Sequence, residues 1–154
     1  MIYSDPTPVR EARAEYFRAN GFEADGGYDA RWVKVKLGQV PVWFPNTAAR
    51  RRAVRLHDLH HLATGYETSL VGEAEIGAWE LAGGCEHYAA AWVLNIAAVL
   101  LGLLVAPRRL WRAFLRGRQS ETLYHLGFED RCLDETVGEL RRWLRLRGAG
   151  DAAT

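Results

Sequence analysis

The 154-residue chain has few cysteines and little net charge, and each scarcity narrows what the protein can be. Its two cysteines, Cys85 and Cys132, lie far apart and lack the spacing of a zinc or redox motif, so we expect buried free thiols in a reducing compartment. A formal charge of +1 argues against a polyanion-binding surface, and we expect no nucleic acid partner. The N-terminus lacks the apolar segment of a secretory signal, which favours a cytoplasmic location.

The length suits one globular domain that needs no disulfide or metal to bury a core. We predict a mostly α fold, a helical bundle with a small N-terminal β-hairpin, in a single domain of residues 1–154. An N-terminal helix and the hairpin occupy residues 8–45, the helical core spans about 46–147, and the tail 148–154 is expected to be disordered.

Turn and cap residues place the predicted elements. Pro8 opens the first helix and Gly21 ends it. Apolar and charged residues alternate from Trp32, a turn follows at Gly38-Gln39, and Pro41 makes the second strand an edge strand. The next predicted helix runs from Asn46 or Thr47 to about Thr64, and Gly65 ends it; another runs from Thr68 or Ser69 to Gly83-Gly84. Two further helices cover residues 86–105 and 107–116. A short element follows Ser120, and Asp134 can cap a final helix that ends at about Leu146.

Three of the five histidines fall within five residues of one predicted helix. Taking His57 as zero, His61 lies at about 40° and Asp58 at about 100° around the helix axis, so the three form one arc. The loop after Thr64 reverses the chain and brings Glu73 against this arc, together with Glu80 seven residues later. The residues predict either a metal site or a crowded, solvated helix surface, and His60 is expected at the surface or supporting a ligand.

The full spacing is His57-Asp58, two residues, His61, eleven residues, Glu73. This pattern, within "HDLHHLATGY" and the following "GE", resembles the signature of the ubiquinone (coenzyme Q) biosynthesis protein four family, from about Asn46 to Gly83 and more weakly to Phe128. Two other metal motifs do not fit. The HD-type phosphohydrolase pattern needs a further histidine upstream, but His57 is the first histidine of the chain. The HExxH metalloprotease pattern needs a glutamate where Asp58 stands.

The resemblance implies that His57, Asp58, His61 and Glu73 are metal ligands and that the ion is zinc, whereas two nitrogens and two carboxylates also suit manganese or ferrous iron. It implies a prenylated quinone precursor or isoprenoid lipid as ligand, action on the head-ring C1 by oxidative decarboxylation, and contact with other quinone-biosynthesis enzymes. It also implies a position peripheral to the inner membrane. The alternative is a non-catalytic, lipid-binding scaffold with a structural metal, and a third is a helical domain without metal.

An uncharged run, "YAAAWVLNIAAVLLGLLVA", covers residues 88–106 and precedes the arginine-rich "PRRLWRAFLRGR". It fits a core helix of the bundle, a lipid-tunnel or membrane-surface helix, or, least well, a short membrane span. The following helix sets apolar residues opposite arginines, as in helices that dock on anionic lipid. The six tryptophans lie on separate elements and are expected to anchor the core.

Overall fold

The chain is mostly helical, as predicted, in the computed structural model, which describes residues 2–37, 40–127 and 129–146. Predictions for the tail 148–154 and for the turn at Gly38-Gln39 lie outside these residues. The elements are α1 (Val9–Ala19), β1 (Trp32–Leu37), β2 (Val40–Pro45), α2 (Ala48–Thr64), α3 (Leu70–Gly83), α4 (Ala89–Leu103), α5 (Pro107–Gly117), α6 (Leu123–Leu126), α7 (Glu129–Leu133) and α8 (Val137–Trp143).

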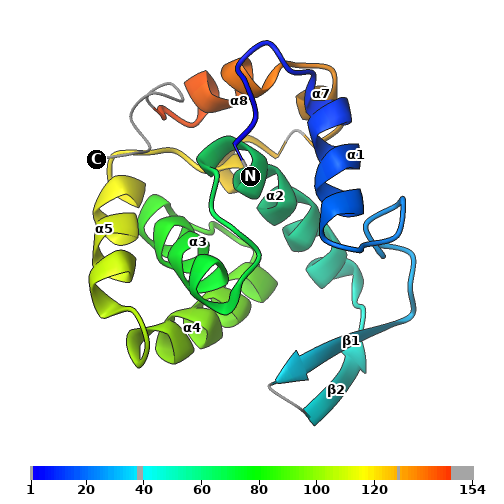
Figure 1. The fold of residues 1–154 in the computed structure, drawn as a ribbon, viewed down its shortest axis with the longest axis vertical. Helices are drawn as coiled ribbons and strands as arrows, with labels where there is room; N and C mark the ends of the chain where they lie inside the picture. The colour runs from blue at the N-terminus through cyan, green and yellow to red at the C-terminus, as the bar shows by residue number, and fades with distance from the viewer. Residues whose placement is uncertain (1, 38–39, 128, 147–154) are drawn as a thin grey trace.

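The two strands form a two-stranded antiparallel sheet, with Trp32 opposite Pro45 and Leu37 opposite Val40. In Figure 1 this sheet projects from the helical part of the molecule beside the start of α2. Asn46, between β2 and α2, is buried and donates from its side-chain amide to the carbonyls of Tyr28 and Ala30. The sheet is thereby fastened to the segment that precedes it.

The ends of α2 and α3 follow the predicted caps. Thr47 accepts a hydrogen bond from the Arg50 N–H at the start of α2, and Gly65 ends that helix in the left-handed conformation at φ 79°. Ser69 caps α3 by accepting from the Gly72 N–H. Because the side-chain oxygens satisfy first-turn N–H groups, these short polar residues determine where each helix begins.

α2 packs against α1, α4, α6 and α8, while α3 packs mainly on α4 and α5 (Figure 1). Small residues on both helices allow α3 to pack on α4. A Cβ at Gly77 of α3 would lie 3.3 Å from the Asn95 carbonyl oxygen of α4, and a Cβ at Gly102 of α4 would lie 2.2 Å from the Ala74 Cβ of α3. Glycine therefore allows α4 to approach α3 closely. Leu59, Leu62, Trp79, Leu123 and Leu140 are among the fully buried core side chains.

Two predictions about the helices are wrong. The cap of the last helix, α8, is not Asp134 but Thr136, whose hydroxyl and backbone exchange hydrogen bonds with Glu139, and α7 before it was not predicted. Asp134 instead pairs with Arg10 of α1. A capping box satisfies two N–H groups at once, which a lone aspartate cap does not.

The core-helix interpretation of residues 88–106 is also wrong, since only Ala91, Asn95 and Gly102 of α4 are buried. Tryptophan was expected in the core, yet among the six only Trp79 is fully buried, and the others are wholly or partly exposed: Trp32, Trp43, Trp92, Trp111 and Trp143. Most of the large apolar side chains of α4 are therefore exposed. Over the described parts of the chain, no helix has both the length and the apolar character needed to cross a membrane.

Candidate metal centre

Two histidine side chains of α2 meet at their outer ring nitrogens. His57 and His61 are one helical turn apart, their rings are nearly perpendicular with centroids 4.8 Å apart, and their Nε2 atoms are 3.2 Å apart. Tyr16 of α1 stacks on the His61 ring at 5.7 Å between centroids. Helical spacing alone brings these nitrogens together, because residues four apart lie on one face.

Glu73, in the first turn of α3, completes the group. Its Oε2 lies 3.2 Å from His57 Nε2 and its Oε1 lies 3.4 Å from His61 Nε2. One ligand atom from each of these three side chains lies within 4.8 Å of the others. The predicted reversal of the chain after Gly65 therefore places Glu73 against the two histidines.

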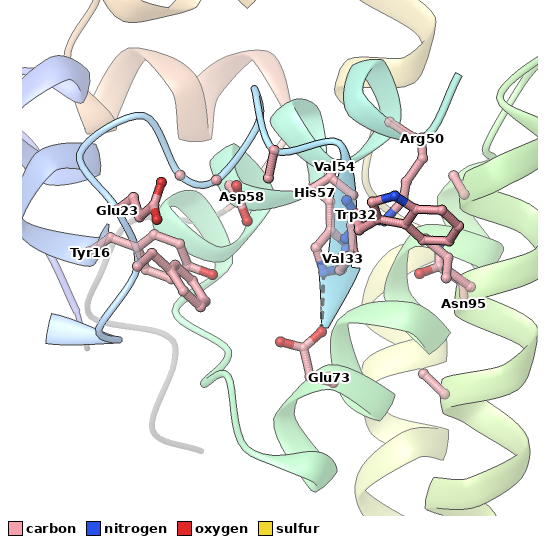
Figure 2. A pocket seen from close by; sticks show the side chains of 18 of the residues that line it. Tyr16, Glu23, Trp32, Val33, Arg50, Val54, His57, Asp58, Glu73 and Asn95 are labelled. Atoms are coloured by element: carbon pink, nitrogen blue, oxygen red, sulfur yellow. Dashed lines mark hydrogen bonds and ion pairs between the residues drawn. The ribbon is translucent and has the colours of Figure 1, made fainter. Parts of the chain in front are cut away.

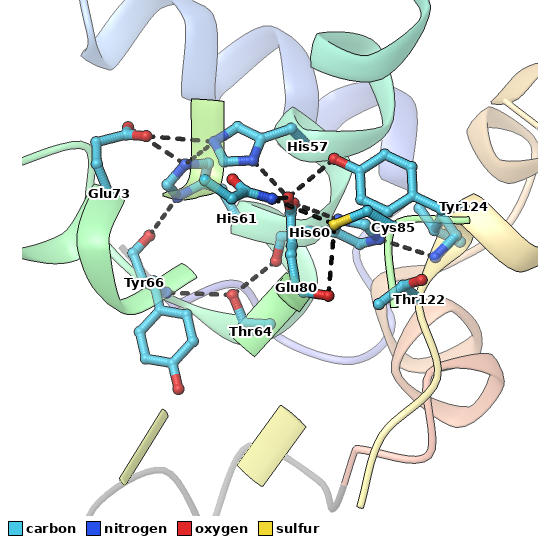
Figure 3. A network of polar contacts seen from close by, with 12 residues as sticks. His57, His60, His61, Thr64, Tyr66, Glu73, Glu80, Cys85, Thr122 and Tyr124 are labelled. Atoms are coloured by element: carbon cyan, nitrogen blue, oxygen red, sulfur yellow. Dashed lines mark hydrogen bonds and ion pairs between the residues drawn. The ribbon is translucent and has the colours of Figure 1, made fainter. Parts of the chain in front are cut away.

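Hydrogen bonds at the inner nitrogens fix which ring nitrogens are free to bind an ion. His61 Nδ1 donates to the Tyr66 carbonyl at 2.9 Å, and His57 Nδ1 donates to Glu80 Oε1 at 2.8 Å, as Figure 3 shows. A carbonyl or carboxylate can only accept here, so each Nδ1 carries the proton and each neutral ring has its lone pair on Nε2. With both rings neutral, two lone pairs and a carboxylate then face one small volume, an arrangement that a metal ion between them would stabilise.

The electrostatics of the metal-free site favour positive charge, which a proton on His57 supplies. Burial alone would lower the pKa of His57, but the charges and hydrogen bonds of Glu80 and Glu73 raise it well above its usual value. Burial would likewise raise the pKa of Glu73, yet hydrogen bonds and charge from His57 and His61 lower it. Both shifts have one origin, a site that is stable when positive charge lies between the rings and the carboxylate.

The distances suit a small divalent metal ion. Ligand atoms held at zinc bond lengths in a tetrahedron lie about 3.3 Å from one another, close to the 3.2 Å between the two Nε2 atoms. Each Glu73 oxygen faces a different ring nitrogen, Oε2 at 3.2 Å from His57 and Oε1 at 3.4 Å from His61. Two imidazoles and a carboxylate fit zinc, manganese and ferrous iron alike. Three protein ligands leave at least one coordination position for water or substrate.

Asp58 is not brought into this group. It is buried, and its Oδ2 accepts a hydrogen bond of 2.5 Å from the Tyr28 hydroxyl, so the carboxylate is directed to the segment before β1. Burial raises the pKa of Asp58. Its position about 100° around the helix from His57 explains the difference, because that rotation aims it at a different neighbour.

His60 is fully buried, so the surface position considered for it is wrong. Its Nδ1 donates to Glu80 Oε1 at 2.6 Å, and its Nε2 accepts from the Leu123 N–H at 2.9 Å. The ring packs against Trp79 and Tyr124. The only sequence signal for this role is the placement of Glu80 on the same face of α3 as Glu73.

Two members of the site gave no recognisable signal in the sequence. Asn95 of α4 donates from Nδ2 to Glu80 Oε2 at 2.5 Å, and the Tyr124 hydroxyl of α6 donates to the same oxygen at 2.9 Å. Both lie far from the histidine helix along the chain. Their contribution arises only from tertiary packing, which a single sequence does not reveal.

A pocket of about 580 Å³ adjoins the group. Figure 2 shows His57 and Glu73 at its wall, with Trp32, Val33 and Arg50 on one side and Tyr16 and Asp58 on the other. Residues of α4 complete the apolar part of the lining, among them Ala91, Leu94 and Ala98. The pocket thus has a polar end at the candidate metal ligands and largely apolar walls, as ligand sites commonly have.

Fold and site together define a helical protein with a two-histidine, one-carboxylate group at the wall of a pocket. Comparison of the chain with protein-family models, with curated proteins and with solved structures gives no match. The function is therefore argued from the geometry and from the motif.

Proposed function

We propose that the protein is a metal-dependent enzyme of prenylquinone biosynthesis that acts on the head-ring C1 of a prenylated aromatic acid. His57, His61 and Glu73 would hold the metal, with zinc as the first choice and manganese or iron as alternatives. One observation carries the proposal: a three-ligand group with both histidine tautomers already set lies at the wall of a pocket of about 580 Å³. Three ligands with an open position favour catalysis, whereas a closed set of four favours a structural metal.

The motif spacing supplies the choice of substrate, and the pocket is compatible with it. Trp32 and Leu94 offer apolar surface to a ring and its attached chain, while Arg50 brings positive charge to the same lining. When bound, a divalent metal supplies positive charge that binds the ring carboxylate or a neighbouring phenolate. Replacing the C1 carboxyl with a hydroxyl releases carbon dioxide and is a two-electron oxidation; it balances when water supplies the hydroxyl oxygen and dioxygen accepts the two electrons and two protons to leave as hydrogen peroxide.

The site residues have separate roles in this reaction. Glu73 is 38% exposed, so it can contact both the metal and the pocket, whereas His61 is buried and is held from behind by Tyr66. Walls that exclude water around the reacting ring strengthen the electrostatic interactions at its polar end. Asp58 holds Tyr28, and with it the segment that leads into β1 and the pocket wall.

The test is metal content followed by turnover. Wild type, His61→Ala and Glu73→Gln are purified without chelator and analysed by elemental mass spectrometry, with Glu75→Gln as the matched control, since Glu75 also lies on α3 but pairs with Arg109. We expect near-stoichiometric metal in wild type and the control and none in the other two. Turnover of a prenylated hydroxybenzoate under air should follow the metal. Equal metal content in all four proteins would refute the proposed site.

A second candidate function, a lipid-binding scaffold at a membrane surface, is favoured by the exterior of α4 and α5. We call this the α4–α5 surface; its large exposed apolar residues are Trp92, Val93, Ile96, Leu100, Leu101, Leu103, Leu104, Val105, Trp111 and Leu115. Arg108 and Arg112 lie beside them, exposed. Apolar side chains flanked by arginines suit the interface of a membrane with anionic lipids.

This surface also continues toward the pocket, because Leu94 is both exposed and part of the pocket lining. A prenyl chain could pass from lipid to pocket along α4. Co-sedimentation with vesicles tests the idea: binding to vesicles that contain anionic lipid should fall sharply in Leu104→Glu and in Arg108→Glu. Vesicle binding that is unchanged in both variants would exclude the membrane role. A pure scaffold would bind metal and vesicles and never turn over substrate.

A further inference from the structure

Glu80 lies at the centre of the polar network behind the candidate metal ligands. Its side chain is fully buried, and both carboxylate oxygens are occupied: Oε1 accepts from His57 and His60, and Oε2 accepts from Asn95 and Tyr124. Figure 3 shows it between the two histidines, on the side of His57 away from Glu73. Four donors from α2, α4 and α6 therefore hold one carboxylate of α3 in a single orientation.

This arrangement controls the His57 ring. Each neutral imidazole carries one proton, and the nitrogen that donates to Glu80 Oε1 at 2.8 Å keeps it. The other nitrogen, Nε2, is then left with its lone pair toward His61 and Glu73. Without an acceptor at Nδ1, the proton is free to occupy Nε2, and in that tautomer His57 offers no lone pair to a metal there.

His60 supports the carboxylate from the opposite side. Its Nε2 accepts the Leu123 N–H at 2.9 Å, so the proton of the neutral ring lies on Nδ1 and is donated to Glu80 at 2.6 Å. The backbone of α6 thereby fixes the tautomer of His60, and His60 fixes the position of Oε1. A glutamine at position 80 could not satisfy this set of four donors, because its amide group brings two further donors into a place that supplies donors only.

We infer that Glu80 is a positioning residue that holds the His57 ring with Nε2 toward Glu73 and His61 and so sets the strength and geometry of metal binding. The inference rests on the proposed metal site and extends it to a residue outside the motif. Carboxylates that accept a hydrogen bond from the ring N–H that does not bind the metal commonly change metal affinity by about 10–100-fold when they are removed.

The test compares Glu80→Gln with wild type and with Glu75→Gln, which makes the same change on α3 at a carboxylate bound by Arg109. Zinc affinity is measured by competition with a chelator, and Co²⁺ is used as a spectroscopic probe of ligand geometry. We expect Glu80→Gln to bind zinc about 10–100-fold more weakly and to change the Co²⁺ absorption spectrum. Glu75→Gln should match wild type in both. Wild-type affinity and an unchanged Co²⁺ spectrum in Glu80→Gln would overturn the inference.

A second measurement needs no metal, and its result in wild type is informative without any variant. ¹⁵N-edited NMR of labelled histidines in the metal-free wild type should show a slowly exchanging, far-downfield proton on His57 Nδ1, and Glu80→Gln should lose it. Absence of that proton in wild type would overturn the inference even if Glu80→Gln does not fold. Failure of every protein to bind metal would refute the proposed function, while the Nδ1 proton would still decide whether Glu80 positions the ring.

Discussion

Replacing Tyr28 with phenylalanine removes one hydroxyl, the group that donates to Asp58 Oδ2 at 2.5 Å in the buried region beside the pocket. A hydrogen bond to a charged acceptor contributes about 1.5–3 kcal/mol to stability, and its loss leaves a buried carboxylate without that donor. For a chain of this length, 1 kcal/mol corresponds to about 2–4 °C in the melting temperature. We therefore expect Tyr28→Phe to melt about 3–12 °C below wild type.

Thermal unfolding followed by circular dichroism measures the loss, and metal analysis of the same samples shows what Asp58 does. Since Asp58 lies outside the His57, His61 and Glu73 group, Tyr28→Phe and Asp58→Asn should both retain stoichiometric metal. A double-mutant cycle between the two positions should give a coupling energy of about 0.5–3 kcal/mol, as expected for residues in contact.

Two results would refute this reasoning. Loss of metal in Asp58→Asn, at the level seen in His61→Ala, would make Asp58 a ligand, as the motif implies. An unchanged melting temperature in Tyr28→Phe would show that the bond from Tyr28 does not stabilise the fold.

The remaining predictions concern metal, packing and thiol chemistry. Zinc at about 100 times its dissociation constant should stabilise wild type by about 2.7 kcal/mol, or about 5–11 °C in melting temperature; Glu73→Gln should show no such rise, and an equal rise would place the ion elsewhere. Gly102→Ala should destabilise the protein by about 1–3 kcal/mol in urea unfolding, because the added methyl meets Ala74 Cβ at 2.2 Å, and Ala74→Gly in the same chain should restore part of the loss; no destabilisation would contradict the packing of α4 on α3. Burial raises the pKa of the Cys85 thiol to about 12, so the thiolate fraction is small at pH 8 and increases only as the pH approaches that value. Both buried cysteines should therefore resist a thiol reagent in the native protein and react in denaturant, and rapid reaction of the native protein would contradict their burial.

Local chemistry explains why much of the fold could be predicted. Thr47, Gly65 and Ser69 act within a few residues of themselves, so their effects on helix ends are visible in the sequence. The same holds for His57 and His61, which helical spacing brings together, and for Glu73, which a short loop returns to them. The cap of the last helix was predicted at Asp134, whereas Thr136 and Glu139 form the stronger start, and α7 before it was not predicted.

Long-range contacts explain the rest. Glu80 was predicted to share a face with Glu73, but nothing near it in the sequence identifies Asn95 and Tyr124 as its donors. The sequence around His60 gives no sign of its burial, because its contacts with Leu123 and Tyr124 of α6 form only in the folded protein. The apolar run of α4 has the composition of a core helix, and only its packing through small residues onto one side of α3 shows that its other side is exposed.

The Glu80 network has a consequence for any attempt to transfer this site. The three candidate ligands lie within 17 residues of chain, yet the groups that hold them come from as far away as Tyr16, which stacks on His61, and Tyr124, which donates to Glu80. A peptide comprising α2, α3 and their loop would contain both histidines and both glutamates, but Glu80 would lose the donors from α4 and α6. The histidine rings of the peptide would sample both tautomers and many rotamers, and metal binding would be weaker because it would have to order them. The metal affinity of the motif thus depends on the whole domain, although the short signature contains all three candidate ligands.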